Sequence, residues 1–146
     1  MHTVNYNVAL PMEFVQNNIL LIAVAFASGA MLIWPFVRRT AGGPWVSTLQ
    51  ATQMINREDA LVLDVREPAE YAKGHILGAK NAPLQELERR AGEFEKHKSK
   101  PVIVTCDSGS RATRAIGVLK SRGFAKAVNL AGGYNAWQQA GLPVEK

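Results

Sequence analysis

Short apolar runs in the later part of the chain have the pattern of buried β-strands. Residues 61–65, Leu-Val-Leu-Asp-Val, show no alternation of apolar and polar positions, and residues 102–104 are three consecutive β-branched apolar residues. A strand that is covered on both faces, as in a parallel sheet between two helical layers, has this pattern. We therefore predict strands over 61–65 and 102–106, and two more over 45–46 and 127–130.

Helical spacing of apolar residues fills the segments between these strands. Apolar residues recur at intervals of three or four over 84–94 and over 112–119. Ser47 and Gln50 have the spacing of a capping box, so a further helix is predicted to start there and to end near Asn56. Shorter helices are expected after Pro68 and over 134–140. This alternation predicts an α/β fold, with a small parallel sheet and helices on both of its faces.

The first part of the chain has a different pattern. Residues 14–37 include no charged residue, and the last 19 of them are mostly apolar. A helix of that length spans roughly 28 Å, close to the hydrocarbon thickness of a bilayer. We therefore predict four regions: a short polar N-terminus at 1–16, a transmembrane helix at 17–37, a linker at 38–45 and the folded domain at 46–144.

Two alternatives exist for the apolar segment, a cleaved signal peptide and a buried core helix. The run Ala25-Phe26-Ala27 resembles a small-residue cleavage site, but no basic residue precedes it and the apolar run continues beyond it. A core helix would show a polar face, and none is visible in the sequence. Arg38 and Arg39 follow the apolar run. The positive-inside rule then predicts an N-terminus outside the cell, a catalytic domain in the cytoplasm and membrane lipid as a partner.

Composition and charge limit the remaining possibilities. A hydrophobic content of 47% in 146 residues is enough for one compact domain. The net charge is +5, and all Lys and Arg residues lie from Arg38 onward, interleaved with Asp and Glu. Because this pattern has no block of like charge, we expect no nucleic-acid binding. Anionic substrates or lipid headgroups are the expected partners of the positive charge.

The chain contains one cysteine, Cys106, and three scattered histidines, His2, His75 and His97. One cysteine excludes an intramolecular disulfide, and a thiol that is meant to react favours a reducing compartment. The four residues do not have the spacing of a zinc site. We expect neither a metal nor a cofactor, and we expect His75 to have a structural role.

Candidate chemistry is concentrated where the predicted strand 102–106 ends. Cys106 is followed by a small polar loop and by an arginine at the start of the next helical pattern; these residues are Asp107, Ser108, Gly109, Ser110 and Arg111. Backbone N–H groups of such a loop can converge on one point, at which the positive end of the helix is also directed. A thiolate, or an anion attached to its sulfur, would be stabilised there. The alternative is a packed, inert thiol, but the position of Cys106 at the very end of the strand, before a small polar loop, favours a reactive nucleophile.

Three motifs in order resemble those of the rhodanese (sulfurtransferase) family. The loop Cys106–Ala112 is similar to the family's form C-x-x-G-x-R-[S/A]. The segment Asp64–Pro83 resembles its first signature, and Leu130–Trp137 resembles its closing strand, turn and helix. The resemblance covers about 46–144 and implies the rhodanese-like fold, with no cofactor.

The resemblance implies transfer of sulfane sulfur. The Cys106 thiolate would attack the outer sulfur of a donor such as thiosulfate and become a persulfide, and cyanide, a thiol or an acceptor protein would remove that sulfur. The loop from Asp107 to Arg111 would bind the persulfide, although a carboxylate at Asp107 repels anionic donors unless it points outward. Asp64 and Arg66 follow another strand end, and we expect them to brace the loop.

The sequence leaves three other functions open. Cysteine phosphatases and arsenate reductases have a C-x5-R loop, whereas only four residues separate Cys106 from Arg111, so this tighter loop suits one sulfur atom. A second alternative is a persulfide carrier at the membrane that passes sulfur to a protein. The third is a partner-binding module without enzymatic activity.

Overall fold

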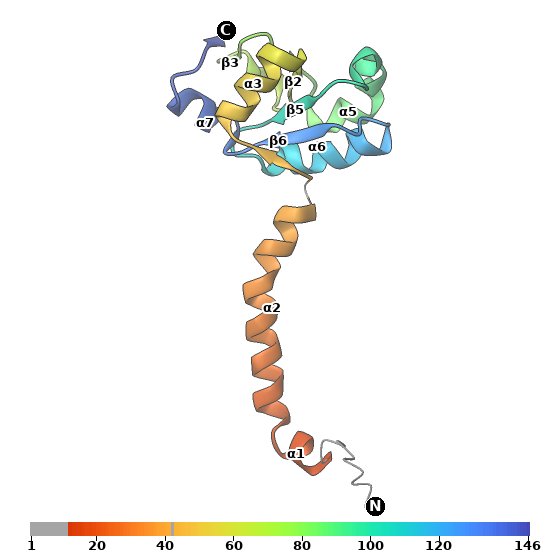
Figure 1. Cartoon of the computed structure of the whole chain (residues 1–146), viewed down its shortest axis with the longest axis vertical. Helices are drawn as coiled ribbons and strands as arrows, with labels where there is room; N and C mark the ends of the chain where they lie inside the picture. The colour runs from red at the N-terminus through yellow and green to blue at the C-terminus, as the bar shows by residue number, and fades with distance from the viewer. Residues whose placement is uncertain (1–11, 42) are drawn as a thin grey trace, which may run out of the picture. The chain divides into compact units, whose positions relative to one another are not determined.

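The computed structural model describes residues 12–41 and 43–146, which divide into one unit that ends at Arg38 and another that begins at Arg39 (Figure 1). Helix α1 (Met12–Asn17) belongs to the first unit, and α2 (Ile19–Ala41) begins in it and ends at the start of the second. The two helices meet at Asn18, whose side-chain amide donates to the Phe14 carbonyl at 2.8 Å.

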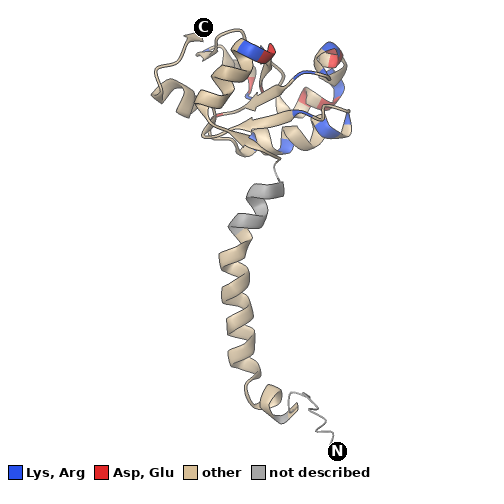
Figure 2. Cartoon of the chain, in the orientation of Figure 1, with Lys and Arg blue, Asp and Glu red and all other residues tan. Residues whose placement is uncertain are grey.

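Most apolar side chains of α2 over residues 19–34 are exposed, and this part of the helix has no charged residue (Figure 2). Within the described ranges, no helix is both long enough and apolar enough to cross a bilayer. The transmembrane helix predicted over 17–37 is therefore not supported. Because α2 continues to Ala41, the first residues of the predicted linker 38–45 are helical.

A five-stranded parallel sheet forms the centre of the second unit. Its strand order is β1 (Trp45–Val46), β6 (Ala127–Leu130), β5 (Val102–Thr105), β2 (Leu61–Asp64) and β4 (Lys80–Asn81). All four described pairings between these strands are parallel. The four strands predicted from the sequence are confirmed, and all of them except the edge strand β1 are fully buried.

Successive side chains of the strands point to opposite faces of the sheet, and each face carries one hydrophobic cluster. Leu63 and Val104 pack in the cluster formed with α5 (Leu84–Arg90), the 3-10 helix η1 (Ala91–His97) and α6 (Ser110–Ser121). Val62 and Ile103 pack in the other cluster, formed with α3 (Thr48–Glu58) and α7 (Gly133–Gln139) (Figure 1). The predicted α/β architecture, with helices on both faces, is confirmed.

Local sequence signals explain two helix boundaries. The capping box is formed, since the Ser47 hydroxyl accepts from the Gln50 N–H and the Gln50 side chain accepts from the Ser47 N–H. The helix predicted over 84–94 is instead an α-helix to Arg90 followed by η1. Gly92 lies at this change, and glycine disfavours a continuous α-helix.

Two short strands lie outside the main sheet. Strand β3 (His75–Ile76) pairs antiparallel with β7 (Val144–Glu145) near the C-terminus. It follows α4 (Pro68–Tyr71), a short helix after β2. The chain from α4 to β3 therefore follows directly after the end of β2. The polar residues Asp64 and Arg66 of the candidate site lie at this strand end.

Candidate active site

Cys106 directly follows β5, at the carboxyl edge of the parallel sheet, where open α/β sheets carry their sites. Its residue exposure is only 1%. The Gly109 N–H donates to the Cys106 Sγ at 3.1 Å, so the loop turns back onto the sulfur. Gly109 has a φ of +102°, and a Cβ at this position would lie 2.8 Å from the Trp45 ring. Both the backbone conformation and the close packing require glycine here.

The N-terminus of α7 fixes the first two peptide groups of the loop. The Tyr134 N–H donates to the Cys106 carbonyl at 2.7 Å, and the Asn135 N–H donates to the Asp107 carbonyl at 3.2 Å. A Cβ at Gly133, whose φ is +58°, would lie 2.2 Å from the Cys106 carbonyl oxygen. The close approach of α7 to the loop therefore depends on Gly133.

Asn129 holds the other end of the loop. This residue of β6 is fully buried, and its Nδ2 donates to the Gly109 carbonyl and to the Thr113 hydroxyl, both at 3.0 Å. The Thr113 N–H also donates to the Gly109 carbonyl. The residue whose N–H contacts the sulfur is thus anchored to the sheet behind it.

Arg66 lies beside the loop and is almost completely buried. Its Nε and Nη2 donate to the Asp64 carboxylate at 2.7–3.0 Å, and Nη2 also donates to the Gly74 carbonyl at 2.8 Å. The guanidinium carbon lies 4.2 Å from the centre of the Tyr134 ring, a cation–π contact. Burial is the largest single influence and lowers the pKa of Arg66, but the hydrogen bonds with Asp64 and the negative charges of Asp64 and Asp107 together outweigh it, so the pKa is raised.

Arg111, at the start of α6, makes a two-pronged ion pair with Glu70 of α4, with N–O distances of 2.7 and 2.9 Å. It also donates to the Asp107 carboxylate. The hydrogen bonds from Arg111 lower the pKa of Glu70 to about 2, and those to Glu70 raise the pKa of Arg111. Asp107 additionally lies 3.8 Å from the Arg66 Nη1, so it connects the two arginines.

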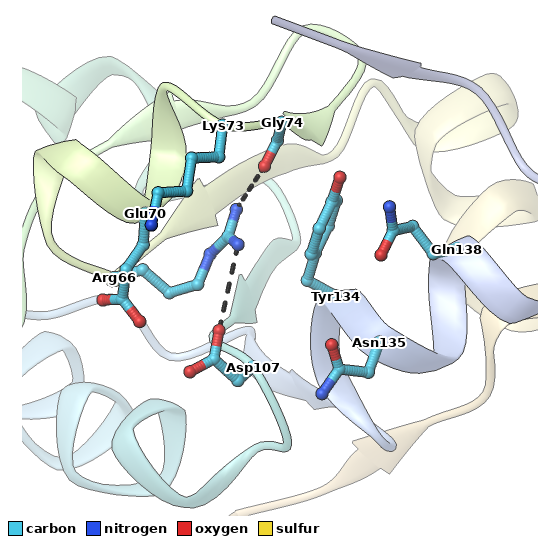
Figure 3. A pocket seen from close by; sticks show the side chains of 8 residues that line it. All are labelled: Arg66, Glu70, Lys73, Gly74, Asp107, Tyr134, Asn135 and Gln138. Atoms are coloured by element: carbon cyan, nitrogen blue, oxygen red, sulfur yellow. Dashed lines mark hydrogen bonds and ion pairs between the residues drawn. The ribbon is translucent and has the colours of Figure 1, made fainter.

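A cavity of about 300 Å³ opens next to this cluster (Figure 3). It is lined by Arg66, Glu70, Lys73, Gly74, Asp107, Tyr134, Asn135 and Gln138. In Figure 3 the Arg66 guanidinium lies between Gly74, Asp107 and the face of Tyr134. The lining includes Asp107, the neighbour of Cys106, but not Cys106 itself.

The structure brings most of the sequence-predicted site residues together. Asp64 and Arg66 reach the loop through Asp107, and Arg111 braces the loop through the same carboxylate. Ser108 and Ser110 are exposed, and among the described residues the only N–H that donates to the sulfur belongs to Gly109. The sequence predicts several backbone N–H groups that converge on the sulfur, and one such hydrogen bond to the sulfur is described.

His75 lies outside the loop. Its ring stacks on Tyr71 at 3.6 Å, its Nδ1 lies 3.0 Å from the Tyr71 carbonyl, and its Nε2 lies 3.4 Å from the Glu145 carboxylate. Its described contacts therefore connect α4 with the β3–β7 pair.

Sequence reasoning missed three residues that hold the loop: Glu70, Asn129 and Gly133. Glu70 lies 41 positions before Arg111, so no local spacing connects the two. Asn129 interrupts an otherwise apolar strand, Ala-Val-Asn-Leu, which is a signal for a buried polar role. The glycine pair at 132–133 indicates only a turn when the sequence is considered alone.

Comparison with known proteins identifies the family. Residues 47–140 match the family model of the rhodanese-like domain. The uncharacterized protein YibN of Escherichia coli K12 is 37% identical over 135 residues, which cover 91% of this chain and 94% of YibN. A sulfurtransferase of Allochromatium vinosum is 36% identical over 92 residues, which cover 63% of this chain and 84% of that protein.

Solved structures agree with this result. The rhodanese-like domain of an Anabaena protein superimposes with a TM-score of 0.64 at 30% sequence identity, over 70% of this chain and 78% of that one. The residues matched by the family model extend from the capping box of α3 to the end of α7 and include the whole Cys106 loop. The chain therefore belongs to the family of rhodanese-like domain proteins.

Proposed function

We propose that this protein is a sulfurtransferase that carries sulfane sulfur on Cys106, as a persulfide, from a donor such as thiosulfate to a thiophilic acceptor. A sulfur-transfer role in general is supported by the rhodanese-like domain and by a relative that is named a sulfurtransferase. The observation that carries the proposal is the Gly109 N–H, which donates to the buried Sγ of Cys106 at 3.1 Å.

The reaction has two displacement steps. The Cys106 thiolate attacks the outer sulfur of thiosulfate, a bond forms between Sγ and that sulfur, and the S–S bond of the donor breaks to release sulfite. The acceptor then attacks the outer sulfur of the persulfide and restores the Cys106 thiolate. The sequence has no second cysteine, so no thiol of the same chain can displace the sulfur and form a disulfide.

The peptide orientations around the loop support an anion-binding role. In a trans peptide the C=O and the N–H point in opposite directions. The carbonyls of Cys106 and Asp107 accept from α7, so the N–H groups of Asp107 and Ser108 point away from α7. Among the described hydrogen bonds neither N–H has an acceptor. With the Gly109 N–H and the start of α6, they provide donors for a negatively charged outer sulfur.

The arrangement of Arg111 argues against the phosphatase alternative. A C-x5-R loop resembles a cradle for a tetrahedral oxyanion, whereas the arginine of this shorter loop is held by the Glu70 and Asp107 carboxylates. Its charge is therefore already balanced by carboxylates. Arg111 positions the loop and does not bind a phosphoryl group.

Turnover of the full chain tests the proposal. Thiosulfate and methanethiosulfonate serve as donors, cyanide serves as the acceptor, and thiocyanate is measured with time. We expect thiocyanate formation that depends on protein concentration and is lost in Cys106→Ser. A single turnover without continued activity would indicate the carrier alternative. Activity retained in Cys106→Ser, or no transfer from either donor, would contradict the proposal.

Location at the cytoplasmic face of a membrane remains a separate prediction. Its support is the set of exposed apolar side chains of α2 and the two arginines that follow them in the sequence. Alkaline carbonate extraction of cell membranes, followed by protease treatment of spheroplasts and of inverted vesicles, tests it. The prediction holds if the chain stays in the membrane fraction and the domain is cleaved only in inverted vesicles. It fails if the chain is released or the domain is cleaved from outside.

A further inference from the structure

We propose that Asp107 makes Cys106 selective for sulfane donors of low negative charge, cysteine persulfides above all, and against the thiosulfate dianion. This inference rests on the proposed function and concerns which donor the same site accepts. It is carried by the pairing of the two arginines beside the loop and by the position of the Asp107 carboxylate next to the nucleophile.

Both guanidinium groups near the loop are already occupied. Arg66 binds the Asp64 carboxylate through two nitrogens and the Gly74 carbonyl through one of them, and its side chain is only 4% exposed. Arg111 binds both oxygens of Glu70 and one oxygen of Asp107. A small anionic donor would have to displace one of these carboxylates to gain a bidentate arginine contact.

The charges of this cluster do not favour a dianion. Two guanidinium groups, Arg66 and Arg111, face three carboxylates, Asp64, Glu70 and Asp107, so the cluster has one excess negative charge. Lys73, which lines the same cavity, balances that charge. A donor that enters the cavity therefore meets a cluster with no net positive charge, and the cluster itself gives an anion no net attraction.

Asp107 is the member of the cluster that is adjacent to the nucleophile in the sequence. It is the residue after Cys106, its side chain is 44% exposed, and it lines the cavity. Figure 3 shows its carboxylate facing the Arg66 guanidinium at the lower edge of the cavity. A donor that approaches Cys106 from this cavity passes this carboxylate, so the charge of the donor decides the barrier to approach.

The charge carried through the transfer step differs between donors. With a protonated cysteine persulfide, R–S–SH, the Cys106 thiolate attacks the outer sulfur, the donor S–S bond breaks, RS⁻ leaves and Cys106–S–SH forms. One negative charge is present before and after this step. With thiosulfate, the thiolate and the dianion together bring three negative charges beside Asp107. The Asp107 carboxylate repels the single negative charge of the first reaction only weakly, whereas it repels the three negative charges of the second strongly.

A pair of donors that differ by one charge tests the inference. Thiosulfate is a dianion and methanethiosulfonate a monoanion, and both donate an outer sulfur by cleavage of one S–S bond. The quantity to measure is the ratio of kcat/KM for thiosulfate to that for methanethiosulfonate, with the full-length chain. We expect Asp107→Asn to raise this ratio about tenfold, the order expected for one nearby charge in a partly screened site.

Two control variants separate charge from folding. Asp107→Glu keeps the charge and should leave the ratio within about twofold of the wild-type value. Glu93→Gln removes a carboxylate of η1 that pairs with Arg90 of α5, outside the cluster, and should leave both kcat/KM values unchanged. A ratio that stays constant in Asp107→Asn, while that variant melts at the wild-type temperature, would overturn the inference.

Cysteine persulfide donors then distinguish the source of the sulfur. Free cysteine persulfide is compared with a persulfidated peptide whose cysteine is flanked by lysines and with one flanked by glutamates. We expect the wild-type protein to be loaded faster by free cysteine persulfide and by the lysine-flanked peptide than by thiosulfate. We also expect the glutamate-flanked peptide to load it more slowly than the lysine-flanked one. If thiosulfate loads the protein faster than every persulfide does, the inference about donor charge is wrong, but the proposed function stands. If no donor loads Cys106, both the inference and the proposed function are wrong.

Discussion

The two sides of the Cys106 loop are held by different interactions. Toward α7 and β6, buried backbone N–H groups and the Asn129 amide fix the carbonyls of Cys106, Asp107 and Gly109. Toward α4, partly exposed ion pairs of Arg111 with Glu70 and Asp107 hold the loop. The first side tolerates little change because its contacts are close and buried, whereas the second is screened by solvent. Loop geometry and loop charge can therefore change independently.

The largest effect is expected on the buried side, from Gly133→Ala. Its Cβ would lie 2.2 Å from the Cys106 carbonyl oxygen, and φ is +58°. We expect the free energy of unfolding to fall by about 3 kcal/mol or more. Because the loop must move, we expect kcat/KM for sulfur transfer to fall about a hundredfold. Denaturant unfolding and donor kinetics measure the two quantities.

Gly141→Ala is the matched control for this substitution. Gly141 has a similar φ of +66°, but no heavy atom lies within 4 Å of the position that an alanine methyl would take. Only the backbone strain, about 1–2 kcal/mol, should then appear, with activity close to wild type. Equal losses of stability and activity in the two variants would show that the contact with Cys106 is unimportant.

A smaller effect on the same side is expected from Asn129→Asp, which is nearly isosteric. The substitution replaces the Nδ2 that donates to the Gly109 carbonyl by a carboxylate oxygen, which cannot donate when it is ionised. We expect a loss of about 1–3 kcal/mol in the free energy of unfolding. We also expect a fall in kcat of about tenfold, because Gly109 positions its N–H at the sulfur.

The exposed Gln85→Glu, on α5 and outside the lining of the cavity, provides the control, since it adds one negative charge without touching the loop contacts described above. Stability and kcat should stay near the wild-type values in this variant. If kcat falls equally in both variants, the added negative charge explains the loss, and the Asn129 hydrogen bond does not.

On the ion-pair side, Glu70→Gln should have a modest effect. The pair with Arg111 is partly exposed, so we expect a loss below about 1 kcal/mol at neutral pH. The pKa of Glu70 in the folded protein is about 2, below the ordinary 4.5. Its stabilising contribution is therefore complete above the unfolded-state pKa and is lost as the pH falls through the folded-state pKa. The difference in unfolding free energy between wild type and Glu70→Gln should shrink over this range, and a difference that grows on acidification would contradict this.

The smallest effect concerns salt. Screening weakens exposed ion pairs but has little influence on buried backbone hydrogen bonds. Added sodium chloride should therefore reduce the stability difference between wild type and Glu70→Gln, while the difference between wild type and Gly133→Ala stays the same. Equal salt sensitivity of the two differences would remove the distinction between the two sides of the loop.

Local signals are sufficient to predict much of this molecule. The buried strands at 61–64 and 102–105 have continuous apolar patterns, and the capping box of Ser47 and Gln50 depends on residues three positions apart. The nucleophile loop is also predictable, because Cys106, Gly109 and Arg111 lie within one short motif. Each of these features depends on neighbours in the sequence.

The rest depends on tertiary contacts. Glu70 reaches Arg111 across 41 positions, and the direction of Asp107 is decided by two arginines from different elements. The apolar segment at 17–37 predicts a helix, and α2 is present, but a membrane span is not supported in the described part of the chain. The apolar sequence of this segment indicates that its side chains are favoured away from water, but it does not indicate whether lipid or protein covers them.

Whether Cys106 carries sulfane sulfur is tested most simply by the intact mass of the full chain after reaction with methanethiosulfonate and then with cyanide. We expect a gain of one sulfur atom, located on Cys106 by peptide mapping, and its complete removal by cyanide. The Cys106→Ser chain, which has no cysteine, should show no gain. No added sulfur from methanethiosulfonate, thiosulfate or cysteine persulfide, or an equal gain in Cys106→Ser, would show that Cys106 is not the sulfur carrier.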